Sequence, residues 1–170
     1  MSKQGKLIVI SGPSGVGKAT LIRSLMEALP PNCQLSTSST TRPPRDDETN
    51  GKEYHFVSKK QFEENVVRGE FLEHALYKGE YYGTSKVEVG KIVFAGKSLI
   101  LEIDIQGSRL VKSLMSEAST IFIVPPGPDE IGELRKRLTE RGKNEVKDIE
   151  ERLAIAVNEL EQINFFDHVV

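Results

Sequence analysis

The residues between Lys6 and Thr20 constrain the fold of this chain more than any other stretch. They begin with a run of branched apolar side chains, typical of a buried strand, and then break into three glycines within six residues. Apolar residues at helical spacing follow over 21–29, so the order is strand, glycine loop and helix. Glycines let successive backbone N–H groups face one anion, and the helix N-terminus adds partial positive charge. The stretch therefore predicts a phosphate-binding loop (P-loop) in an α/β protein.

Lys18 supplies a full positive charge for the β- and γ-phosphates of a nucleotide. The strict motif has Ser or Thr after this lysine, as a magnesium ligand, but here the position holds Ala19. Thr20, one residue later, is a candidate replacement, and an ion held through water is the alternative. A glycine turn between any strand and helix would also contain such glycines, but it would not require the lysine.

Composition narrows the class of protein. The 170 residues suit one domain, and 38% hydrophobic with 28% charged residues suit a globular protein. A net charge of −2 and a pI near 6.0 do not indicate a nucleic-acid-binding surface, and no run approaches membrane-spanning length. The single Cys33 excludes an internal disulfide, and with no apolar signal region we expect a cytoplasmic protein. The three histidines lie far apart and without metal-ligand spacing: His55, His74 and His168.

A second anion site is predicted after the first helix, which Pro30 and Pro31 should end. Six consecutive Ser or Thr residues at 36–41 make a poor core strand but a dense row of hydroxyls. Arg42 and Arg45 follow them, and their planar paired donors match a phosphate. A polar turn on a solvated edge is the alternative interpretation.

The rest of the segment 36–89 predicts a small polar α+β insertion. Residues 46–52 are acidic and polar, which indicates a surface turn. Short strands are expected at 54–57, 71–75 and 79–84. Capping boxes that begin at Ser58 and Ser85 predict helices to about residues 68 and 94.

A buried strand is predicted at 97–104, followed by a helix at 107–116 and another strand at 120–124. Glu102 and Asp104 are two residues apart, so on a strand they share a face. Such carboxylates organise magnesium or polarise the site in P-loop proteins. The alternative is that they cap the following helix.

Helices are also predicted from Pro128 to the break at Gly142 and from 145 to 163. These two helices carry four arginines: Arg135, Arg137, Arg141 and Arg152. The arginines indicate a lid that closes over a phosphate, and a solvated basic helix face is the alternative interpretation. Residues 167–170 look like the start of another strand, so we expect the C-terminus to be truncated.

Together these segments resemble guanylate kinase, a P-loop nucleoside monophosphate kinase, over essentially the whole chain. The Gly12–Lys18 loop alone would indicate only nucleotide binding. The Ser39–Arg45 and Tyr81–Thr84 segments are much more specific, and 54–58 and 101–107 also match. The chain departs from the family mildly at Ala19, commonly Gly or Ser there, and at Asp47, often Gly.

The resemblance implies reversible, Mg²⁺-dependent transfer of a phosphoryl group from ATP to GMP, giving ADP and GDP in purine metabolism and GMP recycling. It implies a three-layer α/β/α P-loop core with a parallel sheet (1–35 and 90–127), a GMP-binding insertion (36–89) and a helical lid (128–152). A core helix and the start of a last strand complete the chain (153–170). The resemblance is also compatible with a homodimer.

Site residues follow from the same resemblance. ATP is expected at Gly12, Pro13, Ser14, Gly15, Val16, Gly17, Lys18, Ala19 and Thr20. GMP is expected at Ser38, Arg42, Arg45, Tyr54, Glu73, Tyr82, Gly83, Thr84 and Asp104. The catalytic residues are expected to be Lys18, Arg137, Arg141 and Arg152. No metal ligand is certain, with Thr20 or Asp104 as candidates through water.

Residue chemistry supports guanine independently. Guanine presents two adjacent donors, N1–H and N2–H, which the Glu73 carboxylate can accept together, and its O6 needs a hydroxyl donor. Adenine would leave that carboxylate unpaired. Two alternatives stay open: a guanylate-kinase-like module that binds peptides, which usually has a degraded P-loop, and a P-loop kinase for another phosphorylated small molecule.

Overall fold

The computed structural model describes residues 5–29, 31–140 and 146–170, and its centre is a five-stranded parallel sheet. The strand order is β2-β7-β1-β8-β9. The strands are β1 (Leu7–Ser11), β2 (Cys33–Leu35), β7 (Ser98–Glu102), β8 (Ser119–Phe122) and β9 (His168–Val169). The P-loop strand β1 lies in the middle, between β7 and β8, which puts the loop at the centre of one sheet edge.

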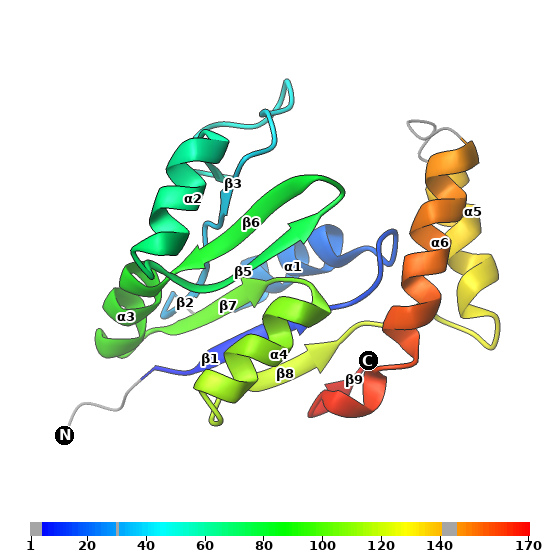
Figure 1. The fold of residues 1–170 in the computed structure, drawn as a ribbon. Coiled ribbons are helices and arrows are strands. Elements are labelled where there is room, and N and C mark those ends of the chain that lie inside the picture. Colours follow the sequence, from blue (N-terminus) through cyan, green and yellow to red (C-terminus); the bar gives the residue numbers. More distant parts are fainter. Residues whose placement is uncertain (1–4, 30, 141–145) are drawn as a thin grey trace.

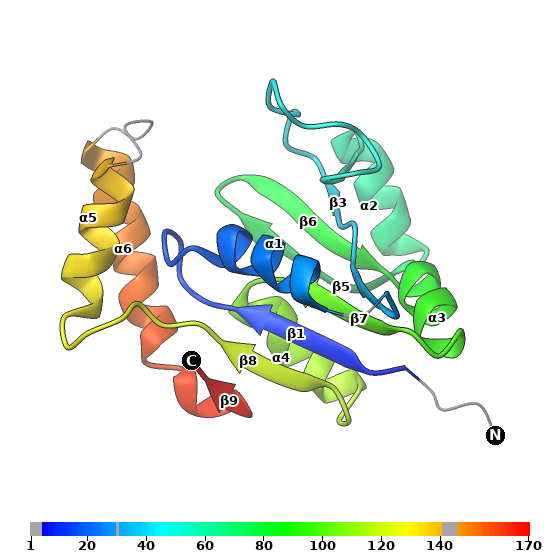
Figure 2. The same cartoon turned by 180° about the vertical axis from the view of Figure 1, so that it is seen from behind.

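Helices cover both faces of this sheet (Figures 1 and 2). Side chains of a strand alternate between faces, so Ile8 and Ile10 of β1 pack with Ile22 and Leu25 of α1 (Lys18–Ala28). On the other face the partners are α3 (Lys86–Phe94) and α4 (Ile105–Leu114). That layer contains Leu7, Val9, Val89, Val93, Leu99, Leu101 and Val111. The predicted three-layer α/β/α core is confirmed.

A second, four-stranded sheet forms the insertion, in the order β4-β3-β6-β5. Its strands are β3 (Ser39–Thr40), β4 (His55–Phe56), β5 (Phe71–Tyr77) and β6 (Glu80–Ser85). The helix α2 (Lys59–Val67) packs on it through Phe62, which is fully buried and stacks on Phe71 with ring centroids 4.4 Å apart. The β5–β6 hairpin lies toward α4 of the core, so the insertion shares a boundary with the central domain.

The predicted capping boxes mark real helix starts. The Ser58 hydroxyl accepts the Gln61 N–H at 3.2 Å, and the Ser85 hydroxyl accepts the Glu88 N–H at 3.4 Å. Glu88 does not complete its box, because its carboxylate accepts the Thr37 N–H at 3.0 Å. A contact with a distant segment thus replaces the local hydrogen bond that the capping box predicted for the Glu88 carboxylate.

Two antiparallel helices stand beside the P-loop at the end toward which the strands of the central sheet point (Figure 1). They are α5 (Glu130–Glu140) and α6 (Val146–Leu160), and the short 3-10 turn η1 (Ile163–Phe165) follows them. The interface between α5 and α6 contains the buried side chains of Leu134, Leu138 and Leu153, and Val16 of the P-loop packs against them. None of the helices in the described ranges is long and apolar enough to cross a bilayer.

Candidate active site

The P-loop has the backbone that its glycine spacing predicts. Gly12, Gly15 and Gly17 have φ of 151°, 94° and 104°, a region that favours glycine. A Cβ on Gly12 would also lie 2.6 Å from the Ile123 carbonyl oxygen, closer than such contacts allow. Gly17 directly precedes α1, so the helix N-terminus faces the loop.

Two adjoining cavities open where the P-loop, the insertion and α6 meet. The smaller has a volume of about 240 Å³, and the wider groove has about 1240 Å³. Predicted residues that line the smaller cavity are Gly12, Ser14, Lys18, Ser38, Tyr54, Glu73, Tyr82, Asp104 and Arg152. Those that line the wider groove are Ala19, Arg42, Arg45, Tyr54, Tyr82 and Arg152. The structure therefore brings predicted ATP and GMP residues to two adjoining cavities, which share Tyr54, Tyr82 and Arg152 in their linings.

Lys18 reaches back over the P-loop from the first turn of α1. Its Nζ donates to the carbonyl oxygens of Gly12 and Pro13, the latter at 3.3 Å. Ala19 and Thr20 are both exposed, and Thr20 lines neither cavity.

Glu73 brings a carboxylate to the smaller cavity from β5, although the residue is only 3% exposed. Its Oε1 accepts the Thr84 hydroxyl at 2.6 Å from the neighbouring strand β6. Burial raises the pKa of Glu73 to about 7, the Thr84 hydrogen bond opposes this rise, and the Asp104 charge adds to it. A carboxyl that titrates near neutral pH in a cavity is typical of a functional site.

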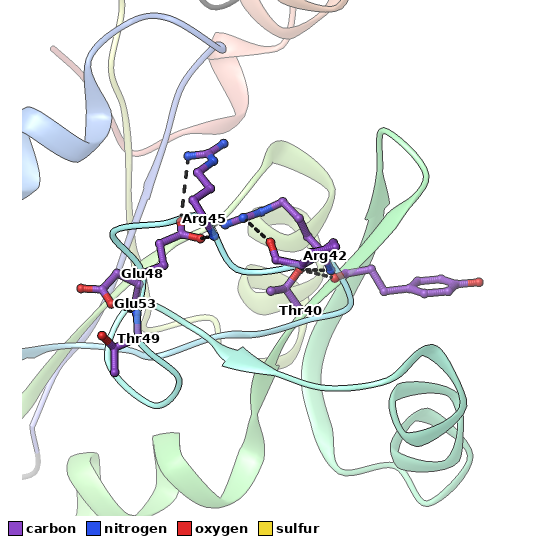
Figure 3. Close-up of polar contacts among 8 residues, drawn as sticks. Thr40, Arg42, Arg45, Glu48, Thr49 and Glu53 are labelled. Carbon is purple, nitrogen blue, oxygen red and sulfur yellow. Dashed lines mark hydrogen bonds and ion pairs between the residues drawn. The ribbon is translucent and has the colours of Figure 1, made fainter.

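Glu48 holds the two arginines of the insertion (Figure 3). Arg42 Nη2 lies 2.8 Å from Glu48 Oε1, and the backbone N–H of Arg45 donates to Oε2 at 2.8 Å. The Glu48 pKa is lowered, chiefly by the Arg42 hydrogen bond. The Arg45 side chain remains 72% exposed, with Nη1 3.9 Å from Glu48. Both cations therefore face the wider groove from a braced loop.

Two tyrosines, Tyr54 and Tyr82, line both cavities. The rings of Tyr54 and Tyr82 meet edge to face with centroids 6.0 Å apart, and the Arg42 guanidinium lies 5.4 Å from the Tyr54 ring centroid. Burial is the main cause that raises the pKa of Tyr54 to about 12. The hydroxyl of Tyr54 thus stays protonated and can donate a hydrogen bond.

Arg152 and Arg137 reach the P-loop from α6 and α5. Arg152 Nη1 donates to the Ser14 hydroxyl at 2.8 Å, while its Nε donates to Asp148 at 2.7 Å. Arg137 Nη1 donates to the Val16 carbonyl oxygen at 2.7 Å. Asp148 also pairs with Lys78 at the tip of the β5–β6 hairpin, so α6 contacts the insertion.

Other predicted residues lie elsewhere. Asp104 does not extend β7, which ends at Glu102: it caps α4 by accepting the Gly107 N–H at 2.8 Å, and it also lines the cavity. Gly83 is buried in β6 against the ring of Phe62, and it lines neither cavity. Arg141 lies outside the described residues.

Three further residues line or support the site and were not predicted from the sequence. Glu48 lies in the segment that the sequence indicated as a surface turn, and its spacing of three from Arg45 was the available signal. Glu159 lines the smaller cavity seven residues after Arg152, hence on the same face of α6. Burial is the main cause that raises its pKa to about 7, and its Oε2 has no hydrogen-bond partner within the described ranges. Tyr77 lines the smaller cavity, and no local pattern in the sequence indicated it; burial is the main cause that raises the pKa of its hydroxyl.

Comparison with known proteins identifies the family. A family model described as guanylate kinase matches residues 4–170. The chain belongs to the guanylate kinase family. The guanylate kinases of Nostoc sp. and Enterococcus faecalis are 45% and 41% identical to it over 163 and 170 residues. These matches cover 96% and 100% of this chain, and 80% and 82% of those two guanylate kinases.

A solved structure agrees with this assignment. The crystal structure of guanylate kinase from Anaplasma phagocytophilum matches with a TM-score of 0.79 and 33% sequence identity. The match covers 100% of this chain and 78% of that one. The P-loop α/β fold and the family thus rest on sequence and structure together.

Proposed function

We propose that this protein transfers the γ-phosphoryl group of ATP to GMP, with magnesium accompanying the ATP. One observation carries the proposal. Two adjoining cavities hold the lysine of a P-loop and a buried carboxylate that can accept the guanine donors in one, and arginines that can hold a second phosphate in the other. Family membership supports the same reaction.

The acceptor side is suited to guanine. Glu73 would accept the N1–H and N2–H donors of the base, and the Ser38 hydroxyl in the same cavity can donate to O6. Adenine offers neither of those two donors, so it would leave the buried carboxylate unpaired, which a site discriminates against strongly. Arg42 and Arg45, held by Glu48, would take the GMP phosphate.

The donor side is suited to phosphoryl transfer, which depends on positioning and charge neutralisation rather than on a protein nucleophile. The loop N–H groups and Lys18 would bind ATP phosphates. Arg152 and Arg137, which contact the loop from α6 and α5, would neutralise charge on the transferred group. Closing the lid over the site would also exclude water.

Magnesium fits this site as an ion carried mainly by ATP. Among the described residues no three His, Cys, Asp or Glu side chains form a group that could hold a metal ion. Mg²⁺ usually keeps several waters and binds through one or two carboxylates together with substrate phosphates. Glu102 and Asp104 line the cavity beside Lys18 and offer hard oxygen ligands through water. Of the two candidates named from the sequence, we retain Asp104, because Thr20 lines neither cavity. The ion would neutralise charge on the phosphates.

We also propose a cytoplasmic location, which the unpaired Cys33 supports because free thiols persist in reducing compartments.

The test is ADP release from Mg-ATP with GMP, with AMP and without acceptor. We expect turnover with GMP alone. Turnover with another acceptor and not with GMP would favour the second kinase hypothesis, and GMP binding without any turnover would favour the interaction module.

Lys18→Ala isolates the donor side. Loss of one preorganised hydrogen-bond donor to developing charge costs about 10²- to 10³-fold in kcat. Because Lys18 would supply a full charge as well as a donor, we expect at least that loss in a folded variant. The control is Lys60→Ala, an exposed lysine on α2. Near-normal turnover of Lys18→Ala would remove Lys18 from the mechanism.

A further inference from the structure

A glycine in the first turn of α4 lies where the core meets the insertion. Gly107 is buried and has ordinary helical backbone, so its glycine identity is not required by a left-handed φ. Glycine is a poor helix former compared with alanine, so a glycine here calls for a packing reason.

The packing reason is the carboxylate of Glu73. A Cβ built on Gly107 would lie 2.6 Å from Glu73 Oε2 and 3.2 Å from its Cδ. Contacts below 3.0 Å do not occur between real Cβ atoms and their neighbours, so the carboxylate would have to move. It has little freedom to do so, because Glu73 is 3% exposed and its Oε1 is held by the Thr84 hydroxyl at 2.6 Å.

The same residue also orients a second carboxylate. The Gly107 N–H donates to Asp104 Oδ1 at 2.8 Å, which sets the direction of that side chain at the start of α4. Asp104 and Glu73 both line the smaller cavity, one from the core and one from the insertion. Gly107 therefore contacts both carboxylates that face the candidate base site.

We propose that Gly107 is a positioning residue for guanine recognition: its missing side chain admits the Glu73 carboxylate, and its N–H orients Asp104. The proposal rests on the GMP-binding role proposed above. Hydrogen bonds weaken steeply as their geometry departs from ideal. A misplacement of about 1 Å can cost on the order of 10²-fold, so displacing Glu73 should weaken GMP binding while the ATP side is unaffected.

The test is Gly107→Ala, with the dissociation constant of GMP measured by calorimetry and the KM values for GMP and ATP measured by turnover. We expect both GMP constants to rise at least tenfold and the KM for ATP to stay within twofold. Gly90→Ala is the matched control, because Gly90 is also in a helix and its added Cβ would meet only the Phe94 ring at 3.8 Å. It should leave all three constants unchanged.

A double variant separates positioning from a general effect on folding. In the Glu73→Ala background the clash with the carboxylate is absent, and only the contact of the added Cβ with Ile103 Cδ1 at 3.3 Å remains, so adding Gly107→Ala should change GMP binding less than twofold. Most of any loss of unfolding temperature caused by Gly107→Ala alone should be absent when the same change is made in that background. A further loss of GMP binding as large as in the wild-type background would overturn the proposal.

The two proposals can fail separately. Unchanged GMP binding in Gly107→Ala, alongside weakened binding in Glu73→Ala, overturns the role of Gly107 alone. Unchanged GMP binding in Glu73→Ala overturns both the guanine role of Glu73 and the role of Gly107.

Discussion

Replacing Glu73 by Gln should make the protein more stable at alkaline pH, by an amount that its environment sets. The pKa of Glu73 rises from an ordinary 4.5 to about 7 in the folded protein. Below pH 4.5 the side chain is neutral in both the folded and the unfolded state, so it contributes no pH-dependent cost. Between these two pKa values only the unfolded state ionises, and folding becomes progressively less favourable. Each pKa unit corresponds to about 1.4 kcal/mol, so the full cost above pH 7 is about 3 kcal/mol.

The isosteric Gln carries no charge and can still accept the Thr84 hydrogen bond through Oε1, so it escapes this cost. We expect the free energy of unfolding of Glu73→Gln, relative to wild type, to increase by about 2 to 3 kcal/mol from pH 5 to pH 8. Urea titrations at both pH values measure it. The raised pKa values of Glu102 and Glu159 cancel, because both proteins contain these groups.

Glu63→Gln, at an exposed position on α2, is the matched control and should show no such increase. A difference between Glu73→Gln and wild type that stays constant within about 0.5 kcal/mol across this range would refute the reasoning, because it would mean that burial does not penalise the Glu73 carboxylate.

Two further predictions concern ion pairs. Lys78→Met should lower kcat with GMP about two- to fivefold. Asp148 pairs with both Lys78 and the guanidinium of Arg152, so loss of Lys78 leaves Arg152 less firmly placed. Partly exposed ion pairs of this kind contribute about 0.5 to 1 kcal/mol, which sets the size of the effect. A double-mutant cycle with Asp148→Asn measures the coupling, and strictly additive losses would contradict it. Asp167→Asn should destabilise the protein by about 1 to 2 kcal/mol at pH 7, through the hydrogen bonds to Lys112 and Thr120. The pKa of Asp167 is lowered to about 2, chiefly by the hydrogen bond from Lys112. The extra stability of the wild type over Asp167→Asn should therefore disappear as the pH falls from about 4 through 2, and acid unfolding of both proteins measures this.

Local features were predictable because their physical causes are local. The φ values of the P-loop glycines and the helix starts at Ser58 and Ser85 depend on residues within a few positions of one another. The alternation of Ile8 and Ile10 with Leu7 and Val9 between two core layers follows from strand geometry. The fold class and most of its elements could therefore be predicted with boundaries close to those observed. The short strands β2 and β3 were not predicted, and residues 39–40, in the hydroxyl-rich stretch interpreted as a poor core strand, do form β3.

The candidate site was predictable only in part. The resemblance to a family indicated most of the residues that line the smaller cavity but only a minority of those that line the wider groove. Which side chains hold the lining residues in place depends on contacts between distant segments. The sequence predicted that Glu48 lies in a surface turn, whereas in the folded protein its carboxylate pairs with Arg42. The strand predicted through Asp104 ends at Glu102, because Asp104 caps α4 instead. Local periodicity carries no information about these contacts.

The sequence by itself determined the P-loop, the alternation of strands and helices and the chemistry available for binding phosphate and guanine. These depend on backbone preferences and on residue types, which each short segment carries with it. Only the tertiary structure decided that the Glu73 carboxylate is buried against Gly107 and that its pKa lies near 7. It also decided that Lys78, at the tip of the β5–β6 hairpin, reaches Asp148 of α6. Such properties arise from desolvation and proximity, which exist only after segments distant in the chain have packed together.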